Sequence, residues 1–213
     1  MSVKLKISVI DYGMGNLKSV FNSLRYIGYT NLFLTDSIRQ ISNSDMLIIP
    51  GVGAFNDAMD NLRSRKLIEA LNKHALQDKK PVIGICLGMQ LFVEHSSEGM
   101  GGKGLGWIQG KVKKFKLPKE QRVPHMGWND ISIRSQHELF KDVPSDNNFY
   151  FVHSYFVECE EKYVVAKCKY GVEFNAAISK ENLIAFQFHP EKSHKNGLKL
   201  LSNTINHLSS QFL

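Results

Sequence analysis

The segment PVIGICLGMQ, residues 81–90, restricts the possible folds more than any other part of the chain. Residues 82–85 are apolar and rich in β-branched side chains, which is typical of a strand buried on both faces of a sheet. Residues 87–94 have helical spacing, so Cys86 is predicted to lie at a sharp turn from strand to helix. A glycine stands two residues before and two residues after it. This is the pattern of a nucleophile elbow with cysteine in place of serine.

Gly84 and Gly88 suit such a turn because a Cβ at either position would collide with the strand or the helix. The turn also places the Cys86 thiol at the start of a helix, where the partial positive charge favours the thiolate. A lone buried cysteine can equally be a small apolar core residue. The elbow alone therefore leaves both interpretations open.

The first half of the chain predicts a doubly wound α/β fold. Strands are expected at residues 3–10, 31–34, 46–49 and 82–85, and helical patterns separate them, including one over residues 56–77. Ser37 is expected to cap a short helix. Alternation of this kind predicts a mostly parallel sheet. Residues 50–55 follow the third strand, and such loops hold ligands or are plain turns.

The second half predicts an antiparallel extension of that sheet. Strands are expected at residues 107–116, 130–134, 149–157, 163–169, 173–178 and 183–188, joined by short turns. Residues 123–129 are too rich in Pro, Gly and large side chains for a regular element, and are expected to form an interaction loop or a loop tucked into the core. A closing amphipathic helix is expected at residues 196–212.

Composition excludes several classes of protein. With 213 residues, the chain can bury about 70% of its unfolded surface, so one domain over residues 1–213 is expected. The three cysteines lack metal-ligand spacing, which predicts a reducing cytoplasm, no disulfide framework and no metal site. No apolar run is long enough for a membrane span. The net charge of +7 comes from dispersed basic residues, so nucleic-acid binding is not expected.

A candidate base follows the last predicted strand. His189 and Glu191 are two residues apart, so on an extended backbone their side chains point the same way. A carboxylate on one imidazole nitrogen leaves the other nitrogen able to take a proton from a thiol. His189 alone could be an ordinary core histidine. Cys86, His189 and Glu191 together, all at strand ends, predict a nucleophile, a base and a group that orients the base.

These motifs resemble the class I (triad) glutamine amidotransferases, and more narrowly the glutaminase subunits of imidazole glycerol phosphate synthases. The resemblance is carried by residues 84–88 and 189–191, and by residues 11–16, 50–55, 124–129, 151–155 and 187–193, which together span nearly the whole chain. It implies a flavodoxin-like doubly wound sheet with an antiparallel extension. It also implies hydrolysis of L-glutamine to L-glutamate and ammonia through a Cys86 thioester, without a cofactor.

The resemblance assigns further roles. Backbone N–H groups of Leu87 and Gly53 would form the oxyanion hole. The substrate glutamine would be held by Gly51, Gln90, His153, Ser154 and Tyr155. A separate (β/α)₈-barrel synthase subunit would receive the ammonia in a heterodimer and make imidazole glycerol phosphate and AICAR in histidine biosynthesis. Residues Asn16, Met126 and Trp128 would lie at or near that interface.

Other functions stay open at this stage. Relatives of such subunits supply ammonia for sugar amidination or amidation in surface-polysaccharide pathways, with the same triad. A non-catalytic binding protein on the same fold would leave Cys86 unreactive toward glutamine-like electrophiles. A related cysteine peptidase would need neither a partner nor the loop at residues 124–129.

Overall fold

A computed structural model describes residues 5–118, 121–134, 138–143 and 148–212. One large sheet runs through it, with the strand order β2 (Leu32–Thr35), β1 (Ile7–Ile10), β3 (Met46–Gly51), β4 (Val82–Cys86), β13 (Leu183–Phe186), β12 (Val172–Lys180), β11 (Val164–Tyr170), β8 (His125–Ile133) and β9 (Asn148–His153). The strands from β2 to β13 are parallel, and those from β13 to β9 are antiparallel. The predicted doubly wound sheet with an antiparallel extension is confirmed.

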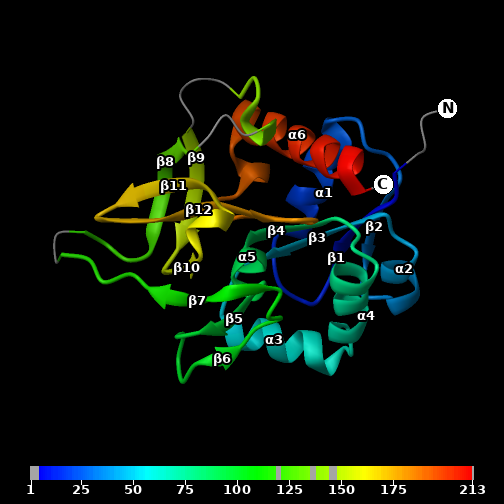
Figure 1. Ribbon diagram of the computed structural model, residues 1–213, viewed down its shortest axis with the longest axis horizontal. Helices are drawn as coiled ribbons and strands as arrows, with labels where there is room; N and C mark the ends of the chain where they lie inside the picture. The colour runs from blue at the N-terminus through cyan, green and yellow to red at the C-terminus, as the bar shows by residue number, and fades with distance from the viewer. Residues whose placement is uncertain (1–4, 119–120, 135–137, 144–147, 213) are drawn as a thin grey trace.

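Helices cover both faces of the parallel part. They are α1 (Leu17–Tyr26), α2 (Ile38–Ser42), α3 (Phe55–Ser64), α4 (Ile68–Asn72), α5 (Leu87–Leu91) and α6 (His194–Phe212), with short helical segments η1 (Lys73–Gln77), η2 (Glu138–Phe140), η3 (Glu161–Tyr163) and η4 (Pro190–Lys192). Figure 1 shows α1 and α6 on one side of the sheet and α3, α4 and α5 on the other. As expected, the Ser37 hydroxyl caps α2 by accepting from the Gln40 N–H.

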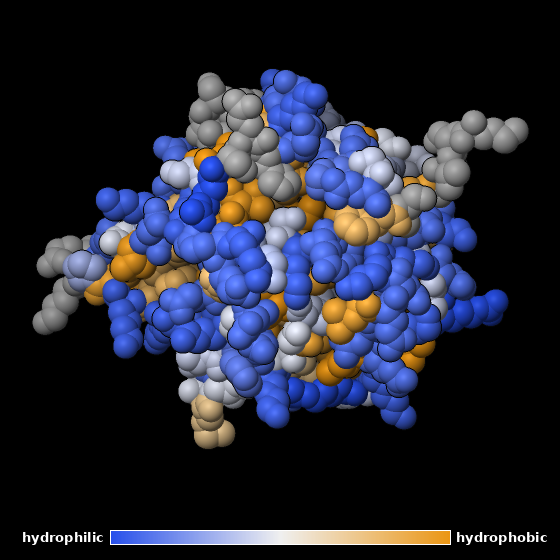
Figure 2. All heavy atoms as spheres, in the orientation of Figure 1, coloured by the Kyte–Doolittle hydropathy of each residue, from blue (hydrophilic) through white to orange (hydrophobic). Residues whose placement is uncertain are grey.

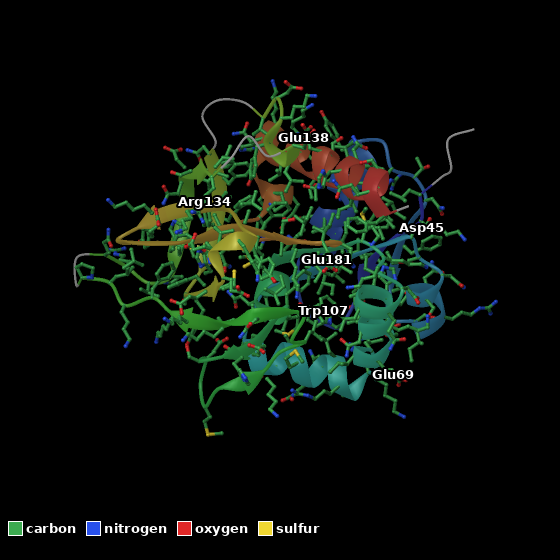
Figure 3. All side chains as sticks on the ribbon, in the orientation of Figure 1. Asp45, Glu69, Trp107, Arg134, Glu138 and Glu181 are labelled. Atoms are coloured by element: carbon green, nitrogen blue, oxygen red, sulfur yellow. The ribbon has the colours of Figure 1, made fainter. Side chains whose placement is uncertain are left out.

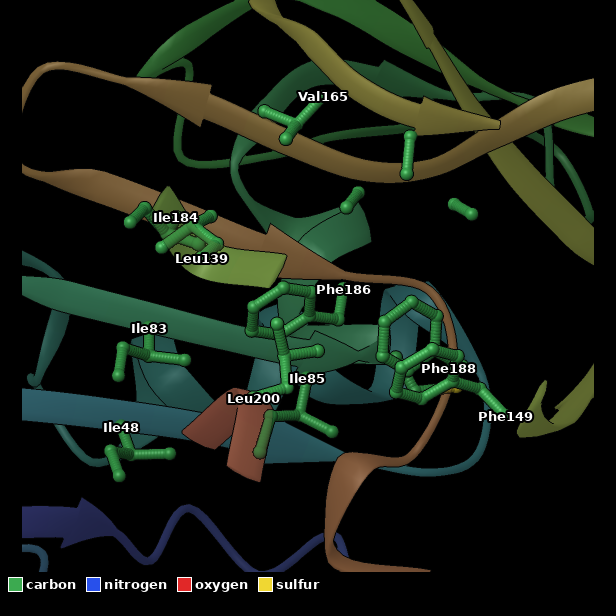
Figure 4. Close-up of a cluster of buried hydrophobic side chains, with 14 of the residues drawn as sticks. Ile48, Ile83, Ile85, Leu139, Phe149, Val165, Ile184, Phe186, Phe188 and Leu200 are labelled. Carbon is green, nitrogen blue, oxygen red and sulfur yellow. The ribbon is translucent and has the colours of Figure 1, made fainter. Parts of the chain in front are cut away.

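Alternating strand residues supply the two halves of the core. Ile48, Ile83 and Ile85 pack with α1, α6 and a group of aromatic side chains, as the close-up in Figure 4 shows in part. Their neighbours Leu47 and Ile49 point to the opposite face and pack against α3 and α5. All of these side chains are fully buried. A parallel sheet covered on both faces explains why its strands are apolar throughout.

A smaller sheet lies beside the main one. Its strand order is β10 (Tyr155–Cys159), β7 (Ile108–Lys114), β5 (Val93–Ser96) and β6 (Gly102–Lys103). The buried Trp107 joins it to α4, because its indole N–H donates to the Asn72 side chain at 2.7 Å; Figure 3 shows this tryptophan between the two elements. The smaller sheet thus closes the side of the molecule next to α5.

Two predicted elements differ from the structure around this sheet. The helix expected over residues 87–94 ends at Leu91, because Val93 instead pairs with Ile108 in a parallel ladder. The single strand expected over residues 149–157 is two strands, and the chain passes from the large sheet to the small one at Ser154. Local helical or alternating patterns did not reveal these long-range pairings.

The segment expected to be an irregular loop, residues 123–129, is mostly strand. From His125 onward it forms β8 and pairs with β9. His125 points inward and stacks between Phe151 and Tyr170, whereas Met126 and Trp128 point outward and stay exposed. The large side chains therefore follow an alternating pattern of buried and exposed positions.

The face of the protein seen in Figure 2 is mainly hydrophilic. In the face shown in Figure 2, hydrophilic residues cover most of the protein and hydrophobic ones are scattered between them. Lys111 and Lys113 on β7 are exposed and both pair with Glu158 on β10. Across the parts of the chain that the structure describes, no helix has the length and apolar character needed to cross a membrane.

Adding a methyl group at Gly88 is expected to destabilise the fold strongly. A Cβ there would lie 1.8 Å from the Ile49 carbonyl oxygen, a backbone atom of β3 that cannot move without distorting the sheet. We expect G88A to lower the free energy of unfolding by about 3 kcal/mol or more, measured by chemical denaturation. The control is G28A, where no atom lies within 4 Å of the new Cβ and only the positive φ opposes it, at about 1 kcal/mol. Equal losses in both variants would contradict the packing account.

Candidate active site

Cys86 occupies a strained turn between β4 and α5. Its φ of +53° lies in the left-handed region, which a residue with a Cβ adopts only when its surroundings enforce it. The close approach of Gly88 to β3 and of Gly84 to Phe92 and Ala185 provides that enforcement. The side chain is 4% exposed. The predicted elbow is therefore present, with the sulfur at the carboxyl edge of the parallel strands.

His189 and Glu191 meet through a turn rather than along a strand. His189 follows β13, and Glu191 lies in the 3₁₀ segment η4. The Nδ1 atom of His189 is 2.8 Å from Oε1 of Glu191, and both side chains are 2% exposed. The Ser193 hydroxyl donates to the His189 carbonyl at 2.6 Å and fixes the turn. This pair has the geometry expected for a base and its orienting carboxylate.

The remaining imidazole nitrogen is available to the nucleophile. Nε2 of His189 is buried and, among the described residues, has no hydrogen-bond partner. Burial lowers the pKa of His189, but the Cys86 thiolate and, after it, the Glu191 carboxylate raise it, and the net shift is upward. A raised pKa means that the imidazole binds a proton readily, which suits a base that takes the proton of the neighbouring thiol.

A cavity of about 440 Å³ opens in front of the sulfur. Its lining brings together most of the residues predicted to form the site, which are Gly53, Cys86, Leu87, Gln90, His153, Ser154 and Tyr155, and adds Val52, Glu98, Pro124, Val152 and Lys192. Gly51, expected to bind substrate, lies outside this lining, buried and paired with Cys86 across the β3–β4 ladder. The space is of the size of a small polar metabolite.

Residues 50–53, at the end of β3 and just beyond it, pack against the turn that follows β1. The Tyr12 hydroxyl donates to the Pro50 carbonyl at 2.6 Å, and a Cβ on Gly53 would lie 2.5 Å from the Met14 side chain. Gly53 has a φ of +109°, which strongly favours glycine. The loop therefore needs glycine where its backbone borders the cavity.

A chain of hydrogen bonds, each with a defined donor and acceptor, links side chains beside the cavity. The Tyr155 carbonyl accepts from Gln90 Nε2 at 3.0 Å and from His153 Nδ1 at 2.8 Å. Asn129 Nδ2 donates to the Lys169 carbonyl at 3.1 Å and to His125 Nε2 at 3.3 Å. The Nε2 atom of His125 therefore accepts, so its proton is on Nδ1, which donates to His153 Nε2 at 3.1 Å. Each histidine thus has one accepting nitrogen, and both are neutral.

Three residues of the site were not predicted from the sequence. Glu98 lines the cavity and accepts from the Phe55 N–H at 2.8 Å. Lys192 lines the cavity and also an adjoining groove of about 430 Å³ beside Asn22 and Tyr26. The buried His125 supports His153. In the sequence, Glu98 stands just before the glycine-rich segment 99–102, and this position was the available signal for it. Lys192 belongs to the motif of residues 187–193.

The residues predicted for a partner interface lie at the surface. Met126 and Trp128 are 62% and 46% exposed, and Trp128 stacks on His194 with ring centroids 4.9 Å apart. Asn16 caps α1 by accepting from the Ser19 N–H. His194 also lines the groove that contains Lys192. An exposed aromatic surface thus adjoins the groove that shares Lys192 with the cavity.

In the described ranges, no group of three metal-ligating side chains is close enough to hold an ion.

Comparison with known proteins places these features in a family. Residues 8–208 match the family glutamine amidotransferase class-I. The chain is 44% identical to an imidazole glycerol phosphate synthase subunit HisH of Vibrio vulnificus, over 98% of both chains. It is 46% identical to an imidazole glycerol phosphate synthase subunit HisH 1 of Campylobacter jejuni, over 93% of this chain and 98% of that one.

Solved structures agree at the level of the fold. A structure described as a glutamine amidotransferase has a TM-score of 0.72 at 15% identity and covers 95% of this chain and 98% of its own. The PurLQS structure from Thermotoga maritima has a TM-score of 0.71 at 17% identity, with coverage of 97% and 100%.

The neutral histidine pair predicts a loss of stability in acid. Burial lowers the pKa of His125 to about 4 and that of His153 to about 3, below the ordinary value for histidine. The unfolded chain binds protons first, so this stability is complete above about pH 6.5 and is lost as the pH falls. We expect H125F, which fits the aromatic surroundings, to reduce the loss between pH 7 and pH 5 by about 1 kcal/mol, measured by urea denaturation. The control H207F removes another histidine; an unchanged slope in H125F would contradict the assignment.

Proposed function

The chain belongs to the class-I glutamine amidotransferases, and from that premise we propose that it is the glutaminase subunit of an imidazole glycerol phosphate synthase. In this role it hydrolyses L-glutamine and passes ammonia to a (β/α)₈-barrel synthase subunit in histidine biosynthesis. The observation that carries the proposal is the strained turn that places the Cys86 sulfur at a small cavity, in contact with the imidazole of His189, whose Nδ1 atom is held by Glu191. The names of the relatives support the pathway.

The chemistry follows from the arrangement of these groups. The Cys86 thiol gives its proton to His189 Nε2, and the sulfur attacks the carboxamide carbon of glutamine. His189 then gives that proton to the leaving nitrogen, so the C–N bond breaks and ammonia departs while a thioester remains. Water, activated by the same imidazole, hydrolyses the thioester to glutamate. Glu191 keeps Nε2 directed toward these atoms throughout.

Backbone N–H groups would stabilise the oxyanion. Leu87 and Gly53 both line the cavity beside the sulfur, and we assign the donors to these two residues. Each such donor contributes about 3 kcal/mol to lowering the barrier. The glycines of residues 50–53 allow the peptide groups there to turn without a side-chain clash.

The substrate glutamine would be held at its far end by polar groups of the cavity. Gln90 and the backbone at residues 153–155 border the space, and Glu98 adds a carboxylate that matches the α-ammonium group of glutamine. Asn16, Met126 and Trp128 would contact the synthase subunit. The site for the acceptor substrate would be supplied by the partner subunit.

Activity in the presence of a partner tests the function. With ¹⁵N-amide glutamine, the synthase subunit and its nucleotide substrate, we expect the label in imidazole glycerol phosphate, and we expect C86A to abolish this transfer while leaving complex formation unchanged. Isotope incorporation is measured by mass spectrometry. Transfer of the label only to a sugar acceptor, when the wild-type chain is paired with the barrel subunit of a sugar-modifying pathway, would contradict the role in histidine biosynthesis. Cleavage of peptide substrates by the chain would contradict the amidotransferase reaction.

Neutralising Glu98 tests the assignment of the ammonium site. We expect E98Q to raise the KM for glutamine about tenfold with a smaller effect on kcat, because a charge-assisted hydrogen bond to the bound substrate is weakened. The matched control is E94Q on β5, an exposed carboxylate outside the cavity lining. A KM that stays at the wild-type value in E98Q would contradict the assignment.

A further inference from the structure

The buried side chain of Gln187 touches the reactive sulfur. Phe186, the last residue of β13, pairs with Ile85 on β4, and the residues that follow these two, Gln187 and Cys86, lie side by side. Nε2 of Gln187 donates to the Cys86 sulfur at 3.7 Å, and the side chain is fully buried. A buried amide requires hydrogen-bond partners, and this one takes the nucleophile as one of them.

The direction of this hydrogen bond is fixed by a backbone carbonyl. The Tyr155 carbonyl can only accept, so Gln90 must turn its Nε2 toward it. The same Nε2 atom then donates to Oε1 of Gln187 at 3.3 Å. With its oxygen held by Gln90, Gln187 has its N–H group on the side of the sulfur.

The two polar contacts of the sulfur favour opposite protonation states. The Val152 carbonyl lies 3.8 Å from the sulfur and can only accept, so it favours the thiol. The Nε2 amide group of Gln187, which faces the sulfur, can only donate. A donor interacts much more strongly with a thiolate than with a neutral thiol. The protein interior strengthens this preference because little water competes there.

We propose that Gln187 is a further catalytic residue, which stabilises the Cys86 thiolate through its side-chain N–H and is held in that orientation by Gln90. This role rests on the proposed function, in which the thiolate attacks glutamine. Gln187 transfers no proton; the proton moves between the sulfur and His189. The N–H contact is strong before attack, weakens when the sulfur becomes part of the neutral thioester, and strengthens again when the thiolate leaves.

The test measures thiolate formation apart from glutamine turnover. The rate of alkylation of Cys86 by iodoacetamide is followed from pH 5 to pH 10 in the complex with the synthase subunit, without glutamine. Peptide mapping distinguishes alkylation of Cys86 from alkylation of the other two cysteines. Burial raises the pKa of Cys159 to about 11 and that of Cys168 to about 12, so these two react more slowly and serve as internal references.

The Q187M variant keeps the length of the side chain and removes the donor. We expect the midpoint of its Cys86 profile to rise by about one pH unit or more, and kcat to fall about ten- to a hundredfold, with a KM for glutamine close to that of the wild type. Q187E keeps the shape and puts a carboxylate beside the sulfur, so its midpoint should rise at least as far. If Q187M does not fold, the Q187E profile decides the question.

The matched control is N182L. Asn182 is a buried amide just before the same strand, bonded to backbone carbonyls of Ala75 and Lys80 and not to the sulfur, so its loss should lower the melting temperature and leave the Cys86 profile unchanged. Wild-type profiles in Q187M or Q187E would overturn the proposal. Shifted profiles in a protein that never hydrolyses glutamine would overturn the proposed function instead and leave the thiolate contact standing.

Discussion

The contact between α5 and the backbone of β3 is the constraint on which the rest of the site depends. Gly88 lies against the Ile49 carbonyl with no room for a side chain. This contact sets where α5 begins and holds Cys86 in its left-handed conformation. The strain in that turn places the sulfur at the rim of the sheet, where a substrate can reach it, while the rest of the segment is buried. Without this packing, the sulfur would be an ordinary core group.

The order of the sheet strands then brings in the base. β13 is parallel to β4 and adjacent to it, although about a hundred residues separate the two strands. Residues that follow the two strands therefore meet, and this places Gln187 beside the sulfur and His189 at the rim. The η4 turn, fixed by Ser193, directs the imidazole back toward Cys86. The core on both faces of the sheet makes this meeting rigid.

Local patterns in the sequence were sufficient for the parallel half of the fold. Apolar strands alternate with amphipathic helices there, and the glycines around Cys86 marked the elbow. The same patterns failed where pairing between distant segments decides the structure. β5 begins in a stretch with helical spacing, and β8 begins directly after Pro124 and contains Gly127, with its His125 buried by neighbours from β9 and β11. No local signal states which strand a segment will pair with.

The site divides in the same way. The triad residues were predicted because their chemistry is visible in residue type and spacing, and the structure places Cys86, His189 and Glu191 together. Glu98, the neutral pair of His125 and His153, and the orientation of Gln187 depend on hydrogen bonds between elements far apart in the chain. Such directions follow only from counting donors and acceptors in three dimensions.

Trapping the covalent intermediate is the most direct test of the account. The complex with a synthase subunit is mixed with L-glutamine, quenched with acid within one turnover, and digested for peptide mass spectrometry. The account predicts a γ-glutamyl thioester on the peptide that contains Cys86, formed before free glutamate accumulates. Release of ammonia with that peptide unmodified at every quench time, or with the adduct on another residue, would contradict it.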